Sequence, residues 1–135
     1  SMALQLTKDS IDLGIITLDA APMVKFYRDT LGLKPDGEMD MPGGSHMTRL
    51  TCGTTTVKIV VNGKKPPAEA APGGIGGSTG YRYFTISVSN LEAVTEMCGE
   101  AGYQIAVPPT NIRPGVTISM IADPDGNWVE LLQMS

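Results

Sequence analysis

The sequence has few of the residues on which metal and nucleophile chemistry usually depend. Its 135 residues include one histidine, His46, and two cysteines, Cys52 and Cys98. A single histidine excludes a metal site made of several histidines from one chain, and a serine–histidine–aspartate triad could use only His46. The cysteines lie far apart without a Cys-x-x-Cys pair, so two reduced, buried thiols are expected rather than a disulfide.

Positive charge and long apolar runs are also scarce. Lysine and arginine total 10 against 14 acidic residues, a net charge of −4, and no basic run occurs. Phosphate contacts need a basic face, so we expect no nucleic acid partner. The sequence has no run of 18 apolar residues and no signal-peptide pattern at its start, so we expect no membrane partner and a cytoplasmic protein. The hydrophobic content of 41% is enough for a core. The expected partners are a small molecule or a protein.

The first half of the chain shows the pattern of one strand, one helix and three further strands. Asp19 can cap a helix of about ten residues, and Gly32 follows it as a C-terminal glycine would. The spacing of Val24, Tyr27 and Leu31 fits one apolar face of that helix. The expected strands are residues 11–18, 33–40, 45–52 and 54–62.

The second half repeats this order. Asn90 can cap a helix that ends at Gly102, and Cys98 lies on its apolar face. The two prolines at 108–109 predict a turn, and Asp-Pro-Asp-Gly at 123–126 predicts the turn of a hairpin. The expected strands are residues 81–88, 103–107, 115–122 and 127–133.

The repeat gives two modules, residues 10–62 and 81–134. Gly32 and Gly102 lie 70 residues apart, and the caps Asp19 and Asn90 lie 71 apart. Between the modules, residues 63–80 are rich in glycine and proline. We interpret this linker as a flexible connection, with a lid over a pocket as the alternative. The order of elements predicts an α+β fold of mixed sheets, each with a helix on its outer side.

The repeat also relates four polar residues in apolar strands. An offset of 71 carries Asp12 to Tyr83, and an offset of 72 carries Lys58 to Glu130. A carboxylate in the apolar run around Glu130 needs an explanation, because burying an unpartnered charge is costly. Two pseudo-symmetric modules that pack together would bring these four positions to one concave face. This arrangement is an expectation from the repeat.

Two motifs carry a resemblance to a known family. The first is "VKFYRDTLGL" at residues 24–33, and the second is "ADPDGNWVELLQ" at residues 122–133. Together they resemble the vicinal oxygen chelate (VOC) superfamily, which includes glyoxalases, bleomycin-resistance proteins and extradiol dioxygenases. The resemblance implies one domain over residues 1–135, made of two βαβββ modules that form a cupped mixed sheet with helices outside. It also implies a homodimer.

The resemblance implies a place for a metal, and the sequence argues against one. In metal-dependent members the ligands occupy positions that match Asp12, Lys58, Tyr83 and Glu130. This chain keeps only the last of the usual ligands and has a possible oxygen ligand in Asp12. An ammonium such as that of Lys58 has no lone pair and repels a dication. We therefore expect no cofactor and disfavour a divalent metal. An extradiol site needs two histidines, and this chain has one.

The resemblance and the residue chemistry together suggest a metal-independent lyase or isomerase that works by proton transfer. Glu130 would move the proton, Lys58 would stabilise negative charge, and Tyr83 would orient or donate. The expected substrate-binding residues are Asp12, Arg49, Tyr81 and Trp128.

The alternatives are a bleomycin-resistance-type protein that sequesters its ligand unchanged and, less favoured, a metal-dependent glyoxalase or dioxygenase. The same residues also have structural interpretations: Glu130 could pair with Lys58, Arg49 could form a surface salt bridge, and Trp128 could belong to the core.

Overall fold

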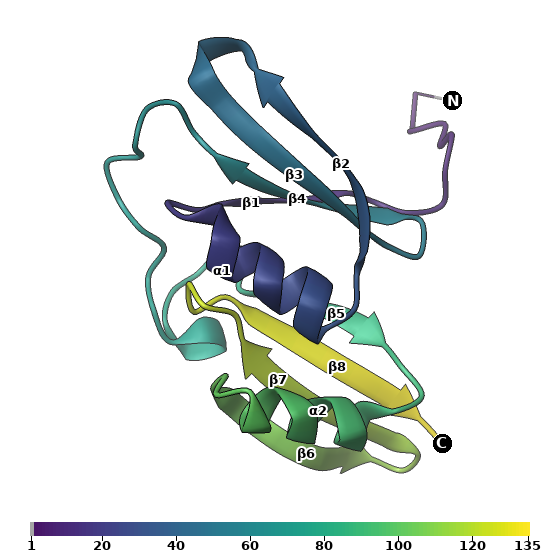
Figure 1. Ribbon diagram of the computed structural model, residues 1–135. Coiled ribbons are helices and arrows are strands. Elements are labelled where there is room, and N and C mark those ends of the chain that lie inside the picture. Colours follow the sequence, from purple (N-terminus) through teal and green to yellow (C-terminus); the bar gives the residue numbers. More distant parts are fainter. Residues whose placement is uncertain (1) are drawn as a thin grey trace. The chain divides into compact units, whose positions relative to one another are not determined.

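The computed structural model describes residues 2–135, and these form two compact units. Unit 1 ends at Pro66 and unit 2 spans Pro67–Ser135. Each unit contains one four-stranded mixed sheet with a helix on one face, as Figure 1 shows for α1 and α2. The strand order is β1-β4-β3-β2 in sheet 1 and β5-β8-β7-β6 in sheet 2. The identical order confirms the α+β fold of two βαβββ units expected from the repeat.

In unit 1 the helical segment begins as an α-helix and continues as a π-helix. Asp19 caps it, accepting a hydrogen bond from the backbone N–H of Ala21 at 3.2 Å. The N–H of Leu31 donates to the carbonyl of Phe26, and Gly32 then turns the chain with a φ of 86°. The elements are β1 (Leu13–Ile16), α1 (Ala20–Val24), η1 (Lys25–Thr30), β2 (Lys34–Met41), η2 (Pro42–Gly44), β3 (Ser45–Cys52) and β4 (Thr55–Val61).

Unit 2 has the same plan with a regular helix. Its first element is a short 3-10 turn within the glycine-rich segment that was predicted to be a linker. The elements are η3 (Gly74–Gly76), β5 (Tyr83–Ser87), α2 (Leu91–Glu100), β6 (Ile105–Arg113), β7 (Val116–Ala122) and β8 (Trp128–Met134).

Two expectations about unit 2 are wrong in detail. Asn90 occupies the N-cap position of α2, but its side chain makes no capping hydrogen bond. The side-chain oxygen Oε1 of Gln133, on β8, accepts from the N–H of Leu91 at 2.9 Å instead. Pro108 and Pro109 lie inside β6 rather than in a turn after it. They fit there because β6 is an edge strand, and on its outer side a missing backbone N–H removes no hydrogen bond to a neighbouring strand.

Each sheet has a covered face and an open face. In sheet 1 the buried residues Leu50, Val57 and Ile59 share the face toward α1, which lies against β4. In sheet 2 a hydrogen bond of 2.8 Å between the buried hydroxyls of Thr95 on α2 and Ser119 on β7 marks the covered face. Since side chains alternate along a strand, the neighbouring positions lie on the opposite, open faces.

The cores of the two units lie under these helices. Met23, Phe26 and Tyr27 are fully buried in unit 1, and Cys98 and Val129 are fully buried in unit 2. Cys98 is in the core as expected, whereas Cys52 is only partly buried, and both thiols are free. None of the helices within residues 2–135 is long and apolar enough to span a membrane.

The two helix starts make a matched test of capping. Asp19→Ala should lower the free energy of unfolding by about 1 kcal/mol, because it removes the acceptor for the N–H of Ala21. Asn90→Ala should change it much less, because the Asn90 side chain accepts no such bond. Urea denaturation of both variants measures the difference. Equal losses would show that the caps are equivalent.

Candidate functional site

Glu130 lies in the middle of β8 on the open face of sheet 2. Its partner in the parallel pairing with β5 is Thr85, whose hydroxyl donates to Oε1 of Glu130 at 2.6 Å. A short hydrogen bond to a carboxylate fixes the position of that oxygen. The other oxygen, Oε2, has no hydrogen-bond partner among residues 2–135. One carboxylate oxygen is therefore held, and the other is available to accept a proton or a hydrogen bond.

Aromatic side chains flank Glu130 on this face. Trp128 precedes it by two residues on β8, and Tyr83 is the cross-strand partner of Trp128. The Tyr83 side chain is about half exposed, at 51%. Tyr81 was expected to contribute as well, but it lies before β5 begins and is fully exposed. Glu130, Trp128 and Tyr83 thus share one face, while Tyr81 lies outside the sheet.

The glycine-rich segment before β5 is held against Trp128. Gly74 lies so close to the indole that a Cβ at this position would be 2.1 Å from Cδ2 of Trp128. Arg82 fixes the segment through its guanidinium, which donates to the carbonyl oxygens of Gly74 and Ala71, each at 2.7 Å. This part of the predicted flexible linker is therefore held in place against Trp128. We call residues 71–77 the glycine strap.

In unit 1 the open face carries two cations at directly opposed positions. Arg49 on β3 pairs with Lys58 on β4, and Gly14 on β1 lies beside Lys58 on the other side. Each cation forms an ion pair without a hydrogen bond: Asp36 Oδ2 is 3.5 Å from Nε of Arg49, and Asp12 Oδ2 is 3.8 Å from Nζ of Lys58. Side-chain exposure is 28% for Arg49 and 32% for Lys58.

Asp12 precedes β1 and is engaged by the N-terminal segment. Its Oδ1 lies 2.7 Å from Nζ of Lys8 and accepts the N–H of Thr56 at 3.0 Å. These two bonds hold the pKa of Asp12 below its usual value, with the Lys8 hydrogen bond as the larger cause. Lys8 also donates to the carbonyl of Thr54, so it ties the N-terminal segment to the start of β4.

The donors in unit 1 do not fit a divalent metal. Two ammonium groups, those of Lys8 and Lys58, already face the Asp12 carboxylate, and a dication there would be repelled by both. Within residues 2–135, no group of three or more histidine, cysteine, aspartate or glutamate side chains is arranged to hold a metal ion.

Asp12 lies at ion-pair distance from Lys58 as expected, but the cross-strand partners of Lys58 and Glu130 are other residues. The strand pairing places Gly14 beside Lys58 and Thr85 beside Glu130, whereas the repeat had singled out Asp12 and Tyr83. Thr85 was missed because a threonine in a strand is unremarkable. The sequence did contain a signal for Thr85, because the repeat offset of 71 residues relates it to Gly14, which occupies the equivalent position in the first module. Arg82 was also missed, since nothing in the sequence shows that it binds carbonyl oxygens.

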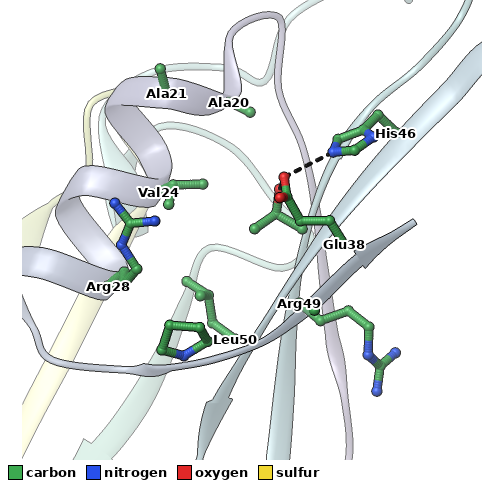
Figure 2. Close-up of a pocket in the computed structure, with 11 residues that line it drawn as sticks. Ala20, Ala21, Val24, Arg28, Glu38, His46, Arg49 and Leu50 are labelled. Carbon is green, nitrogen blue, oxygen red and sulfur yellow. Dashed lines mark hydrogen bonds and ion pairs between the residues drawn. The ribbon is translucent and has the colours of Figure 1, made fainter. Parts of the chain in front are cut away.

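A hollow of about 490 Å³ lies on the covered side of sheet 1, between α1 and the β2–β3 hairpin (Figure 2). Val24, Pro35 and Leu50 contribute apolar atoms to its lining. Arg49 lies beside the hollow, and its guanidinium points away from it (Figure 2). This orientation agrees with its place on the open face.

His46 forms part of the wall of this hollow. Its two ring nitrogens contact two carboxylates, Nδ1 with Asp40 at 2.8 Å and Nε2 with Glu38 at 3.0 Å. The Asp40 and then the Glu38 hydrogen bond raise the pKa of His46 above its usual value of 6.5. An imidazolium that donates from both nitrogens is a poor general base, so the geometry favours a structural role for His46.

The chain thus contains paired βαβββ units, each with a helix on one face of its sheet and polar groups on the other. The family described as Glyoxalase/Bleomycin resistance protein/Dioxygenase superfamily matches residues 10–131, and the chain belongs to this superfamily. No curated protein matches the chain.

Solved structures of low sequence identity share the fold. A glyoxalase family protein from Bacillus cereus is 13% identical, with a TM-score of 0.81 and 99% of each chain covered. A glyoxalase family protein from Enterococcus faecalis is 21% identical, with a TM-score of 0.66 and 95% of this chain and 96% of that chain covered. Glyoxalase I of Leishmania major is 20% identical, with a TM-score of 0.68 and 94% of this chain and 87% of that chain covered.

Gly74→Ala should disturb Trp128, because the added Cβ would overlap the indole ring. We expect a red-shifted emission and stronger acrylamide quenching of Trp128, which is the one tryptophan of the chain, and a loss of stability of about 1–3 kcal/mol. Gly76→Ala is the matched control, since a Cβ there meets nothing within 4 Å. An unchanged spectrum for Gly74→Ala would contradict the packing of the strap on Trp128.

His46 should titrate above pH 6.5 in the folded protein. Because the folded-state pKa is raised, its contribution to stability is fully present below the unfolded pKa of 6.5 and is lost as pH rises through the folded pKa. NMR of the single imidazole measures this directly. Asp40→Asn should lower the pKa most, Glu38→Gln should lower it less, and Asp9→Asn should leave it unchanged. A wild-type pKa at or below 6.5 would exclude the two-carboxylate arrangement.

Proposed function

We propose that this protein is a small-molecule enzyme that removes or shifts a proton next to a carbonyl group, with Glu130 as the general base. The observation that supports this most is the hydrogen bond of 2.6 Å from Thr85 to Glu130 Oε1, which leaves Oε2 without a partner in residues 2–135. A carboxylate with one oxygen held and the other available is oriented for proton transfer. The reaction class is that of a metal-independent lyase or isomerase.

One further residue of unit 2 enters the proposal from its own surroundings. Tyr83 lies on the same face as Glu130 and is half exposed, so its phenol can donate a hydrogen bond to a substrate oxygen and stabilise negative charge that develops there. Metal chemistry has no part in this proposal, because the donors around Asp12 do not fit a dication.

Proton abstraction can be tested without a known substrate. The protein is incubated in D₂O with a panel of α-keto acids and hydroxyketones, and NMR follows the exchange of protons next to the carbonyl. Glu130→Gln should reduce exchange by about 10²–10⁴-fold relative to wild type, the usual contribution of a positioned base. Glu69→Gln, in an exposed loop, is the matched control. Exchange at the wild-type rate in Glu130→Gln would refute the role of Glu130.

The alternative is a protein that binds and sequesters an aromatic ligand. Trp128 and Tyr83 favour it, since they offer adjacent ring surfaces on the open face of sheet 2. The ligand would then quench Trp128 fluorescence and be recovered chemically unchanged, and Glu130→Gln would bind it as well as wild type does. A new product detected by mass spectrometry after long incubation would rule out sequestration.

A further inference from the structure

On the open face of sheet 1, charged and apolar side chains are separated into different rows that run across the strands. Cross-strand partners lie side by side on one face, so each set of paired residues forms a row across the sheet. One row contains Gly14, Lys58 and Arg49. The next row, two residues along each strand, is entirely apolar and consists of Ile16, Val60, Met47 and Met39.

The cations of the first row have no hydrogen-bond partner. Across the described part of the chain, neither the guanidinium of Arg49 nor the ammonium of Lys58 makes a hydrogen bond, and their nearest carboxylate oxygens are 3.5 and 3.8 Å away. Like charges directly opposite each other across two strands are destabilising. Each of the two cations has one carboxylate at ion-pair distance but no hydrogen-bond acceptor, so an added anion would supply the hydrogen bonds that Asp36 and Asp12 do not.

The space around this pair can admit a ligand group. Gly14 has no side chain beside Lys58, and a Cβ there would meet nothing within 4 Å. The planar fork of a guanidinium matches the two oxygens of a carboxylate, and an ammonium adds a point charge beside it. The glycine thus leaves an opening at the end of the row where an oxyanion could approach Lys58.

The local charge favours a monovalent anion. The ionised groups around the row are Arg49, Lys58 and Lys8, which are positive, and Asp12 and Asp36, which are negative. Their net charge is +1. One carboxylate neutralises this charge, whereas a phosphate monoester of nearly two negative charges would leave an excess of negative charge.

We propose that the open face of sheet 1 is a binding site for an amphipathic monocarboxylic acid. The carboxylate lies over Arg49 and Lys58, and the apolar body extends over the partly exposed members of the apolar row, Ile16, Met47 and Met39. This inference depends on unit 1 alone, and it holds whether or not Glu130 acts as a base.

The test uses sodium hexanoate as the probe and amide NMR at pH 7 as the measurement. Hexanoate should shift the signals of β1, β3 and β4, with acetate weaker and hexan-1-ol without effect on the Arg49–Lys58 row. Arg49→Met and Lys58→Met should each weaken hexanoate binding by at least about tenfold, as expected for the loss of one charge-assisted hydrogen bond. Lys65→Met, in an exposed loop, is the charge-matched control and should bind as wild type does.

Further variants separate the two parts of the site and guard against misfolding. Met47→Asn should weaken hexanoate but not acetate, since only hexanoate reaches the apolar row. Arg49→Lys keeps the positive charge but loses the planar guanidinium that binds both carboxylate oxygens. It should retain part of the affinity for hexanoate, and it serves as the test if Arg49→Met does not fold. Three outcomes would each overturn the proposal: hexan-1-ol binding as well as hexanoate, Lys58→Met binding as tightly as Lys65→Met, or phosphate binding more tightly than hexanoate at this row.

Discussion

The parallel pairing of the first and last strand in each unit is the constraint on which the other features depend. After the first strand the chain crosses one face of the sheet as a helix and reaches the second strand at the opposite edge, so the last strand can fill the place beside the first and run parallel to it. That crossing leaves the other face free for polar groups. It also sets β1 beside β4 and β5 beside β8, and these pairings place Gly14 next to Lys58 and Thr85 next to Glu130.

The two units share one strand order but carry different side-chain chemistry at equivalent positions. At the central position of the last strand, unit 1 has a cation without a hydrogen-bond partner and unit 2 has a carboxylate held by a hydroxyl. Beside these residues, the first strand supplies an open space in unit 1 and the hydrogen-bond donor in unit 2. An internal repeat thus preserves the backbone positions while the side chains at those positions have diverged.

The fold could be predicted from the sequence because its signals are local and occur twice. Asp19, Gly32 and Gly102 mark helix ends through their own backbone preferences, and a spacing near 71 residues reveals the second copy. The capping of α2 was mispredicted because its acceptor, Gln133, is 42 residues from Leu91 along the chain. Lys8 was also not expected beside Asp12, although the two are only four residues apart, because their contact depends on how the N-terminal segment folds.

Prediction of the site was more limited, because side chains there act in pairs that the sequence does not show. Arg49 and Lys58 were each singled out, but their direct opposition depends on the register of β3 and β4. Thr85 has no distinguishing feature until it is seen beside Glu130. The glycine and proline content of the linker predicted a flexible segment. Composition carries no information about the hydrogen bonds from Arg82 to the carbonyl oxygens of this segment.

The way Arg82 holds the glycine strap has a consequence for how this segment can vary. Every residue has a carbonyl oxygen, so the bonds from Arg82 to Ala71 and Gly74 do not depend on the side chains at those positions. Steric limits apply at Gly74, which faces Trp128, and at Gly77, where a Cβ would meet the carbonyl of Pro72. Gly73 is restricted as well, because its φ is 95°. Outside such contacts the outer surface of the strap is free to change its sequence, so related proteins could alter what the strap presents to solvent while keeping its place against Trp128.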